Sequence, residues 1–166
     1  MLRPVRDSDE QVVVRAHTVM RSDGFEFAGG YRDGMPFADY VSMLDEQRHA
    51  RDVTPARVPA TFLLADVDGV VVGRTWVRHV LNARLLAIGG HIGYGVLPEH
   101  RRRGHATEIL RQSLVIARSF DARRVLVTCD VDNVASARTI ERCGGVLENI
   151  VDDLDGGPRK RRYWIG

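Results

Sequence analysis

Apolar residues recur along this chain with two different periods, and the change of period separates predicted helices from predicted strands. Phe37, Tyr40, Val41 and Leu44 stand at positions i, i+3, i+4 and i+7, which indicates an amphipathic helix that ends near Arg51. The same helical period predicts further helices over residues 8–20, 107–120 and 135–143.

Short runs rich in β-branched residues predict the strands. In the clearest hairpin, residues 61–65 and 70–77 flank Asp68-Gly69, a pair that suits a tight primed turn. A closing hairpin is predicted from residues 146–152 and 161–165, joined across Asp155-Gly156-Gly157. Single strands are predicted at residues 2–6, 92–96 and 125–128.

The predicted order is β-α-α-β-β-β-α-β-α-β-β, with a long loop rich in glycine and aromatic residues over residues 21–36. Mixed order of this kind favours an α/β (α+β) fold with one central, mostly antiparallel sheet and helices on both faces. The 166 residues are enough for a substantial core, and we expect a single domain over residues 1–166.

Composition is that of a globular protein, with 44% hydrophobic and 28% charged residues and a net charge of +2. No apolar run approaches the roughly 20 residues that cross a bilayer, and the N-terminus has no apolar signal core. Two cysteines form no disulfide framework, so we expect a cytoplasmic protein with no membrane partner. Basic residues cluster at 101–103 and 159–162, but the small net charge does not favour nucleic-acid binding.

The most informative stretch is Arg101-Arg102-Arg103-Gly104-His105-Ala106, between the strand at 92–96 and the helix at 107–120. A loop of small residues at such a junction exposes backbone N–H groups at the positive end of a helix dipole, where phosphate binds. Gly104 and Ala106 let an anion approach the main chain closely, and arginine can grip phosphate with two bonds. Taken alone, three adjacent arginines would also suit an ordinary basic surface patch.

The loop has the pattern Arg-x-x-Gly-x-Ala, which resembles the pyrophosphate loop of the GCN5-related N-acetyltransferases (GNAT). A second block also resembles that family, namely a later helix that begins at Asn133-Val134-Ala135-Ser136 and ends at Gly144-Gly145. The resemblance implies an acetyltransferase that binds acetyl-CoA beside the strand at 92–96. It implies contacts to the cofactor from Val96, Arg101, Arg102, Arg103, Gly104, His105, Ala106, Thr107, Asn133 and Ser136. Gly93 and Gly95 suggest a bulge in this strand, although they could simply relieve packing.

The family tyrosine that protonates the departing thiolate is replaced here by Ile140. Tyr94, Tyr163 or a water could supply that proton instead. His91, at the start of the strand before the loop, is the candidate general base, because an ordinary histidine pKa lies near 6.5. A strand histidine that only makes a backbone hydrogen bond is the competing interpretation. His79 is another candidate, whereas Glu99 and His100 suit a surface role.

A closer resemblance links Arg78-His79-Val80-Leu81-Asn82 and Gly89-Gly90-His91-Ile92-Gly93-Tyr94 to a bacterial subgroup of predicted acetyltransferases. It suggests that Arg78, His79, Asn82 and His91 share a pocket, but it brings no substrate with it. Asp23, Glu26 and Asp33 in the loop at 21–36 could attract a cationic acceptor, or could simply be solvated.

The sequence therefore predicts transfer of acetyl from acetyl-CoA to a primary amine of a small molecule or peptide by direct attack, in a monomer or homodimer. A non-catalytic acyl-CoA-binding or regulatory module is the alternative that Ile140 suggests. Neither a metal site nor a hydrolase nucleophile elbow is signalled, and Pro98 occupies the third glycine position of a dinucleotide fingerprint. Cys129 is interpreted as a small core residue.

Overall fold

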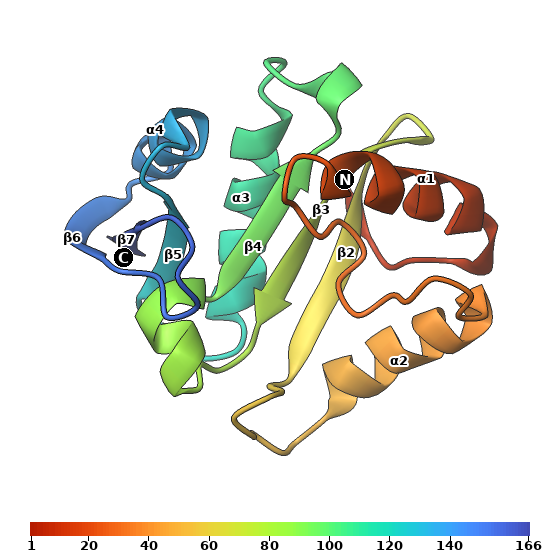
Figure 1. Cartoon of the computed structure of the whole chain (residues 1–166), viewed down its shortest axis with the longest axis horizontal. Coiled ribbons are helices and arrows are strands. Elements are labelled where there is room, and N and C mark those ends of the chain that lie inside the picture. Colours follow the sequence, from red (N-terminus) through yellow and green to blue (C-terminus); the bar gives the residue numbers. More distant parts are fainter.

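In the computed structural model, which describes residues 1–166, the strands form two antiparallel sheets that lie side by side (Figure 1). The first sheet has the order β1-β2-β3-β4, and the second has the order β5-β7-β6. The strands of the first are β1 (Leu2–Arg3), β2 (Ala60–Val67), β3 (Val70–Arg78) and β4 (Ile92–Val96). Those of the second are β5 (Val125–Asp130), β6 (Val146–Val151) and β7 (Lys160–Ile165).

Helices cover both faces of this arrangement, and each face has its own apolar cluster. Helices α1 (Glu10–Arg21) and α2 (Phe37–His49) pack with β2 around Tyr40 and Leu64, both fully buried. Helix α3 (His105–Arg118) packs on the other face, and α4 (Val134–Arg142) joins it beside β5 and β7. The predicted fold class is confirmed, with the central sheet divided between β4 and β5.

Local sequence accounts for most element boundaries. Asp68 and Gly69 adopt φ values of 51° and 83°, as the predicted primed turn between β2 and β3 requires. Asn133 caps α4, because its Oδ1 accepts the Ser136 N–H at 3.0 Å. Gly144, at φ 88°, ends the same helix in the left-handed region.

Three short helical turns differ from the sequence prediction. The segment before β4, where the sequence predicts no helix, is a wide helical turn, η2 (Leu85–Gly89). It had no clear signal, because one turn of five mostly apolar residues is too short to show a period. Two 3₁₀ turns, η1 (Asp7–Asp9) and η3 (Pro98–His100), precede α1 and the loop before α3.

None of the helices is long and apolar enough to cross a membrane. No group of three or more His, Cys, Asp or Glu side chains is arranged to hold a metal ion.

Candidate functional site

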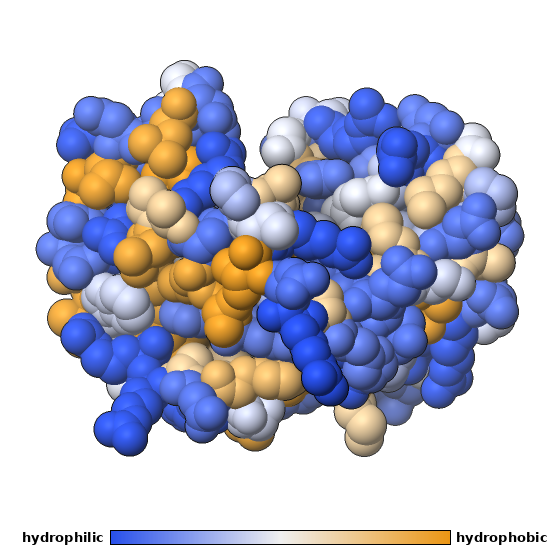
Figure 2. All heavy atoms as spheres, turned by 90° about the horizontal axis from the view of Figure 1, so that it is seen from below, coloured by the Kyte–Doolittle hydropathy of each residue, from blue (hydrophilic) through white to orange (hydrophobic).

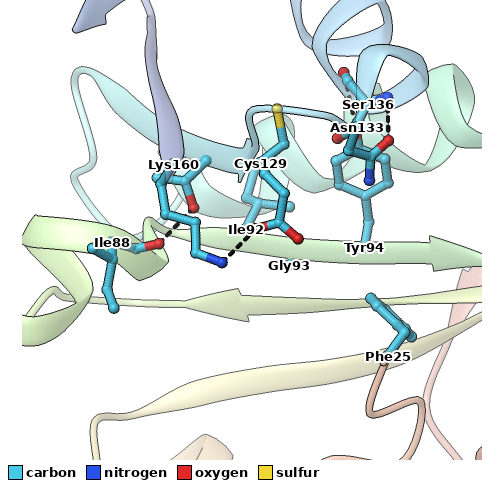
Figure 3. Close-up of a pocket in the computed structure, with 11 residues that line it drawn as sticks. Phe25, Ile88, Ile92, Gly93, Tyr94, Cys129, Asn133, Ser136 and Lys160 are labelled. Carbon is cyan, nitrogen blue, oxygen red and sulfur yellow. Dashed lines mark hydrogen bonds and ion pairs between the residues drawn. The ribbon is translucent and has the colours of Figure 1, made fainter. Parts of the chain in front are cut away.

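A cleft opens between β4 and β5, where the two sheets meet. It contains a cavity of about 200 Å³, and the surface is hollowed between the half of the molecule that holds β5–β7 and the half that holds α1 and α2 (Figure 2). Tyr94, Asn133 and Ser136 lie on one side of β4, and Phe25 lies on the other (Figure 3). The cavity is lined by Phe25, Ile88, Ile92, Gly93, Tyr94, Thr128, Cys129, Asp130, Asn133, Ser136 and Lys160.

His91 joins the two sheets at the closed end of this cleft. Its backbone N–H donates to Leu126 O at 2.7 Å, and its ring Nδ1 accepts the Leu126 N–H at 2.9 Å. The imidazole thus accepts the hydrogen bond that a backbone carbonyl of a neighbouring strand would otherwise accept from the Leu126 N–H. The side chain is buried, which lowers the pKa of His91 and favours the neutral ring that can accept this bond.

Beyond His91, β4 pairs only with β3 and leaves its other edge free toward the cleft. The bulge predicted from Gly93 and Gly95 is absent, because β3 and β4 keep one continuous register. Gly95 instead makes room for Phe25, since a Cβ there would come within 2.6 Å of its ring. A free strand edge presents N–H and C=O groups that an extended ligand with amides can pair with.

The loop before α3 has the open backbone that its sequence predicts. Gly104 adopts φ 86°, and Arg102 adopts φ 62°, which is unusual for a residue with a side chain. No protein acceptor takes a hydrogen bond from any N–H group between Arg102 and Ala106. The Thr107 N–H, which the sequence also assigned to phosphate, donates to Gly104 O at 3.1 Å. Five free N–H groups at the start of a helix form an anion-binding concavity.

The three arginines of the loop do different things. Arg101 donates from Nε to Val96 O at 3.2 Å and from Nη2 to Asp23 at 2.9 Å, so it ties the end of β4 to the loop after α1. Arg102 and Arg103 are exposed and have no ion-pair partner, which leaves both guanidinium groups free. Val96 is buried against α3, so it offers the cleft only its backbone.

Tyr94 reaches from β4 toward the N-terminus of α4. Its hydroxyl lies 2.9 Å from Ser136 Oγ, and both residues line the cavity with Asn133 (Figure 3). Burial raises the pKa of Tyr94 to about 12, so the phenol is protonated at neutral pH. Ile140 is fully buried in the core, and no acid occupies the family tyrosine position.

Arg74 is a buried residue of the site that sequence reasoning missed. It donates to Phe27 O at 3.1 Å, Gly93 O at 2.9 Å and Glu26 O at 2.7 Å, and its guanidinium lies 4.4 Å from the centre of the Phe25 ring. It thereby fixes the loop after α1 against β4. Arg74 stands opposite Gly95 where β3 pairs with β4. Its role could be found only from this pairing between strands, and no local sequence pattern marks it.

The pocket that the subgroup resemblance suggested for Arg78, His79, Asn82 and His91 does not exist as one site. His79 stacks on Phe120 with ring centres 3.6 Å apart and bonds Thr61. Asn82 accepts the Leu85 N–H at 2.9 Å and donates to Thr54 O and Pro55 O, and it does not line the cavity. Arg78 lies next to Gly93, which lines the cavity, but Arg78 is not itself one of the lining residues.

Other sequence candidates are engaged elsewhere. Tyr163 is fully buried and donates to Glu141 at 3.1 Å, so it cannot reach the cleft. Glu99 is exposed and lies 3.6 Å from Arg15, and the His100 ring stands 6.4 Å from that of His105 at the surface. None of these three side chains lines the cavity.

The acidic residues of the loop at 21–36 are also occupied, which argues against the predicted attraction of a cation. Asp23 pairs with Arg101, and Asp33 lies 3.3 Å from Arg21. Glu26 accepts the Gly30 N–H at 3.1 Å.

Solved structures with this fold include several that hold a coenzyme A compound. RimJ from Mycobacterium smegmatis, in complex with CoA-disulfide, superposes with a TM-score of 0.71 at 22% identity, over 99% of this chain and 80% of that one. Spermidine N-acetyltransferase from Vibrio cholerae, in complex with CoA and spermine, superposes with a TM-score of 0.70 at 14% identity, over 99% of this chain and 94% of that one. The putative acetyltransferase yncA from Salmonella typhimurium, with its cofactor acetyl-CoA, superposes with a TM-score of 0.68 at 12% identity, over 99% of this chain and 92% of that one.

No curated protein matches the sequence at a significant level. A family model does match it: the acetyltransferase (GNAT) domain aligns with residues 1–146, which include the open loop and the free edge of β4. The chain therefore belongs to the GNAT acetyltransferase family.

Proposed function

We propose that the protein transfers acetyl from acetyl-CoA to a primary amine by direct attack within a ternary complex. The observation that carries this proposal is the row of five unpartnered N–H groups from Arg102 to Ala106, continuous with the free edge of β4. A diphosphate fits the first feature, and the amides of a pantetheine arm fit the second. The two features lie in the order in which those groups occur along coenzyme A.

On this proposal, Arg102, Arg103, Gly104, His105 and Ala106 bind the diphosphate through their backbone, and the two arginines add positive charge. We assign Arg101 to holding the loop in place, because its Nε and Nη2 already donate to Val96 O and Asp23. Asn133 and Ser136 border the path of the pantetheine arm. Val96 contributes main-chain groups at the end of the strand.

Acetyl transfer forms a bond between the amine nitrogen and the acetyl carbon and breaks the bond between that carbon and sulfur. The amine loses a proton, and the sulfur leaves as a thiolate that gains one. Tyr94 is the group we assign to the second proton, because its phenol is protonated and faces the cleft beside Ser136. Holding both reactants in one cleft supplies much of the remaining rate enhancement.

We assign His91 to positioning rather than to removal of the amine proton. Its Nδ1 already accepts the Leu126 N–H, and its side chain is not part of the cavity lining. By joining β4 to β5 at one point, it sets where the two strands separate. The amine proton then passes to solvent water, because no carboxylate or free histidine stands within the described cavity except Asp130, which pairs with Lys160.

The alternative is a module that binds acyl-CoA without turning it over. The burial of Ile140 at the usual tyrosine position is the observation that favours it. Both proposals require the cofactor to bind the same cleft, so they differ only in chemistry.

The experiment that separates them combines calorimetry with an acceptor screen. Acetyl-CoA is titrated into the protein, and free thiol is then measured with polyamines, amino acids and short peptides as acceptors. Polyamines enter the panel because one structural neighbour was solved with spermine. Amine-dependent thiol release, with an acetylated product by mass spectrometry, supports the enzyme. Tight binding without release supports the module, and absence of binding overturns both.

A further inference from the structure

We propose that the acceptor carries a carboxylate, and that Arg78 binds this group beside Gly93 with Arg74 behind it. The proposal rests on the proposed acetyl transfer and adds the chemical class of the acceptor.

The two arginines converge on the open face of Gly93. The point that a Cβ would occupy at Gly93 lies 3.5 Å from Arg74 Nη1, 3.5 Å from Arg78 Nη1 and 3.7 Å from Arg78 Nη2. These are ordinary van der Waals distances, so a methyl-sized group fits over this glycine without a clash and touches both guanidinium groups. Three guanidinium nitrogens therefore border a small space at the wall of the cavity that Gly93 lines.

Neither guanidinium has an acidic partner within 4 Å, unlike those of Arg3, Arg84 and Arg101. Arg74 uses its donors on three backbone carbonyls. Arg78 makes only two long contacts, from Nη1 to Gly89 O at 3.4 Å and to Gly90 O at 3.3 Å. Its Nε and Nη2 donate to no protein acceptor, which leaves one edge of the guanidinium fork available.

The two positive charges also oppose each other. Burial lowers the pKa of Arg78 to about 10, and burial together with the charge of Arg78 lowers the pKa of Arg74 to about 9. Both side chains are still charged at neutral pH, and neither has an acidic side chain within 4 Å to offset its charge. An anion over Gly93 would offset this repulsion and make charge-assisted hydrogen bonds with the free edge of Arg78.

The position suits the carboxylate of an acceptor rather than a group of the cofactor. Gly93 lies at the opposite end of β4 from the loop at 102–106, and its Cβ face is the Phe25 side of the strand, across β4 from the Tyr94 ring (Figure 3). The cavity of about 200 Å³ leaves room for a compact group, and a planar carboxylate matches the guanidinium fork. The same charges would repel a polyamine, so we expect polyamines to be poor acceptors.

The test measures binding of two probes that differ only in charge. N-acetylalanine and N-acetylalanine amide, the acetylated forms of an acidic and a neutral acceptor, are titrated into the full chain with and without CoA. We expect the acid to bind at least about tenfold more tightly than the amide, as one charged hydrogen-bonded contact provides. Equal affinities, or tighter binding of the amide or of N-acetylspermidine, would overturn the proposal. CoA affinity, measured in the same samples, reports separately on the proposed function.

Variants locate the effect. Arg78→Gln should remove the preference for the acid, whereas Arg78→Lys should keep part of it. Arg84→Gln is the matched control, because it removes one exposed positive charge outside the cleft. Gly93→Ala fills the space over the glycine at ordinary contact distances and is a second test should Arg78→Gln fail to fold. A preference that survives in both Arg78→Lys and Gly93→Ala at full strength contradicts binding over Gly93.

Discussion

The hydroxyl of Tyr94 and the Oγ of Ser136 lie 2.9 Å apart across the cleft, one on β4 and the other in the first turn of α4. On the proposed function, Tyr94 supplies from β4 the proton that a tyrosine at the position of Ile140 would supply from α4. Because Ser136 can donate to or accept from the phenol, the hydroxyl proton can point toward a ligand in the cavity while its oxygen stays fixed. The two residues therefore form the part of the site best placed to deliver a proton.

Tyr94→Phe should lower kcat by about 100-fold, because a positioned general acid contributes on the order of 10²–10⁴ in rate. The KM for acetyl-CoA should stay within a few-fold, since no cofactor contact of the loop is removed. Steady-state assays with free-thiol detection measure both constants. With the pKa of Tyr94 at about 12, the wild-type rate should show no decline from loss of this proton up to pH 10.

The matched control for this prediction is Tyr163→Phe. That phenol is buried, donates to Glu141 and lies outside the cavity, so its loss should affect thermal stability but leave kcat within about threefold. Equal losses of kcat in the two variants would count against Tyr94 as the acid.

Sequence reasoning predicted the parts of this molecule that depend on local pattern. The helices and the hairpin at Asp68-Gly69 follow from period and turn chemistry, and all are found. The open loop at residues 102–106 follows from small residues at a strand-to-helix junction, and its N–H groups are indeed free. Each of these features is decided within about a dozen residues of chain.

Features that depend on distant contacts could not be predicted in this way. The role of Gly95 follows from Phe25, which is 70 positions earlier, and the fixed loop after α1 depends on Arg74. His91 reads as a strand histidine, and only the structure shows that its ring completes the ladder with Leu126. Alternation along a strand predicts which face of the sheet a side chain occupies, but it does not predict which distant residues pack against that face.

Ala106→Glu should weaken CoA binding by about 100-fold, because a carboxylate placed at the open loop stands within a few ångströms of the diphosphate. The chain should still fold, since a negative charge in the first turn of α3 favours the helix dipole, but with a small loss of thermal stability because Ala106 packs beside Val96 and Ile109. Calorimetric titration with CoA and a thermal melt measure the two effects. Ala106→Gln, of the same size but uncharged, should retain most of the affinity, and unchanged binding in both variants would argue that the diphosphate lies elsewhere.

Gly90→Ala should lower the free energy of unfolding by about 3 kcal/mol. Gly90 adopts φ 68° and ψ −178°, a region open almost only to glycine, and a Cβ there would lie 2.6 Å from the backbone oxygen of Leu126. Gly69→Ala is the control, because Gly69 also has a positive φ but meets nothing within 4 Å, so only about 1 kcal/mol should be lost. Urea unfolding of both variants gives the comparison, and equal losses would show that crowding at the β4–β5 junction contributes nothing.

His91 should make the stability of the protein depend on pH below neutrality. Burial lowers the pKa of its ring in the folded state below the ordinary value of 6.5, so the neutral form is favoured by folding. The stabilising contribution is therefore complete above pH 6.5 and is lost as the pH falls toward the folded-state pKa, by at most about 1.4 kcal/mol per pH unit. Urea unfolding between pH 8 and pH 5 measures this slope, above the range where most carboxylates titrate.

His91→Asn separates the positioning role from a catalytic one. The Asn Oδ1 can accept the Leu126 N–H as Nδ1 does, but it does not titrate, so the variant should show a shallower slope than the wild type. His79, whose pKa is also lowered by burial, is present in both proteins and cancels in the comparison. If His91 only sets the point at which β4 and β5 separate, the variant should retain kcat within about tenfold and keep the acidic limb of its pH–rate profile. A stable variant that has lost turnover and this limb together would instead identify the imidazole as the group that takes the amine proton.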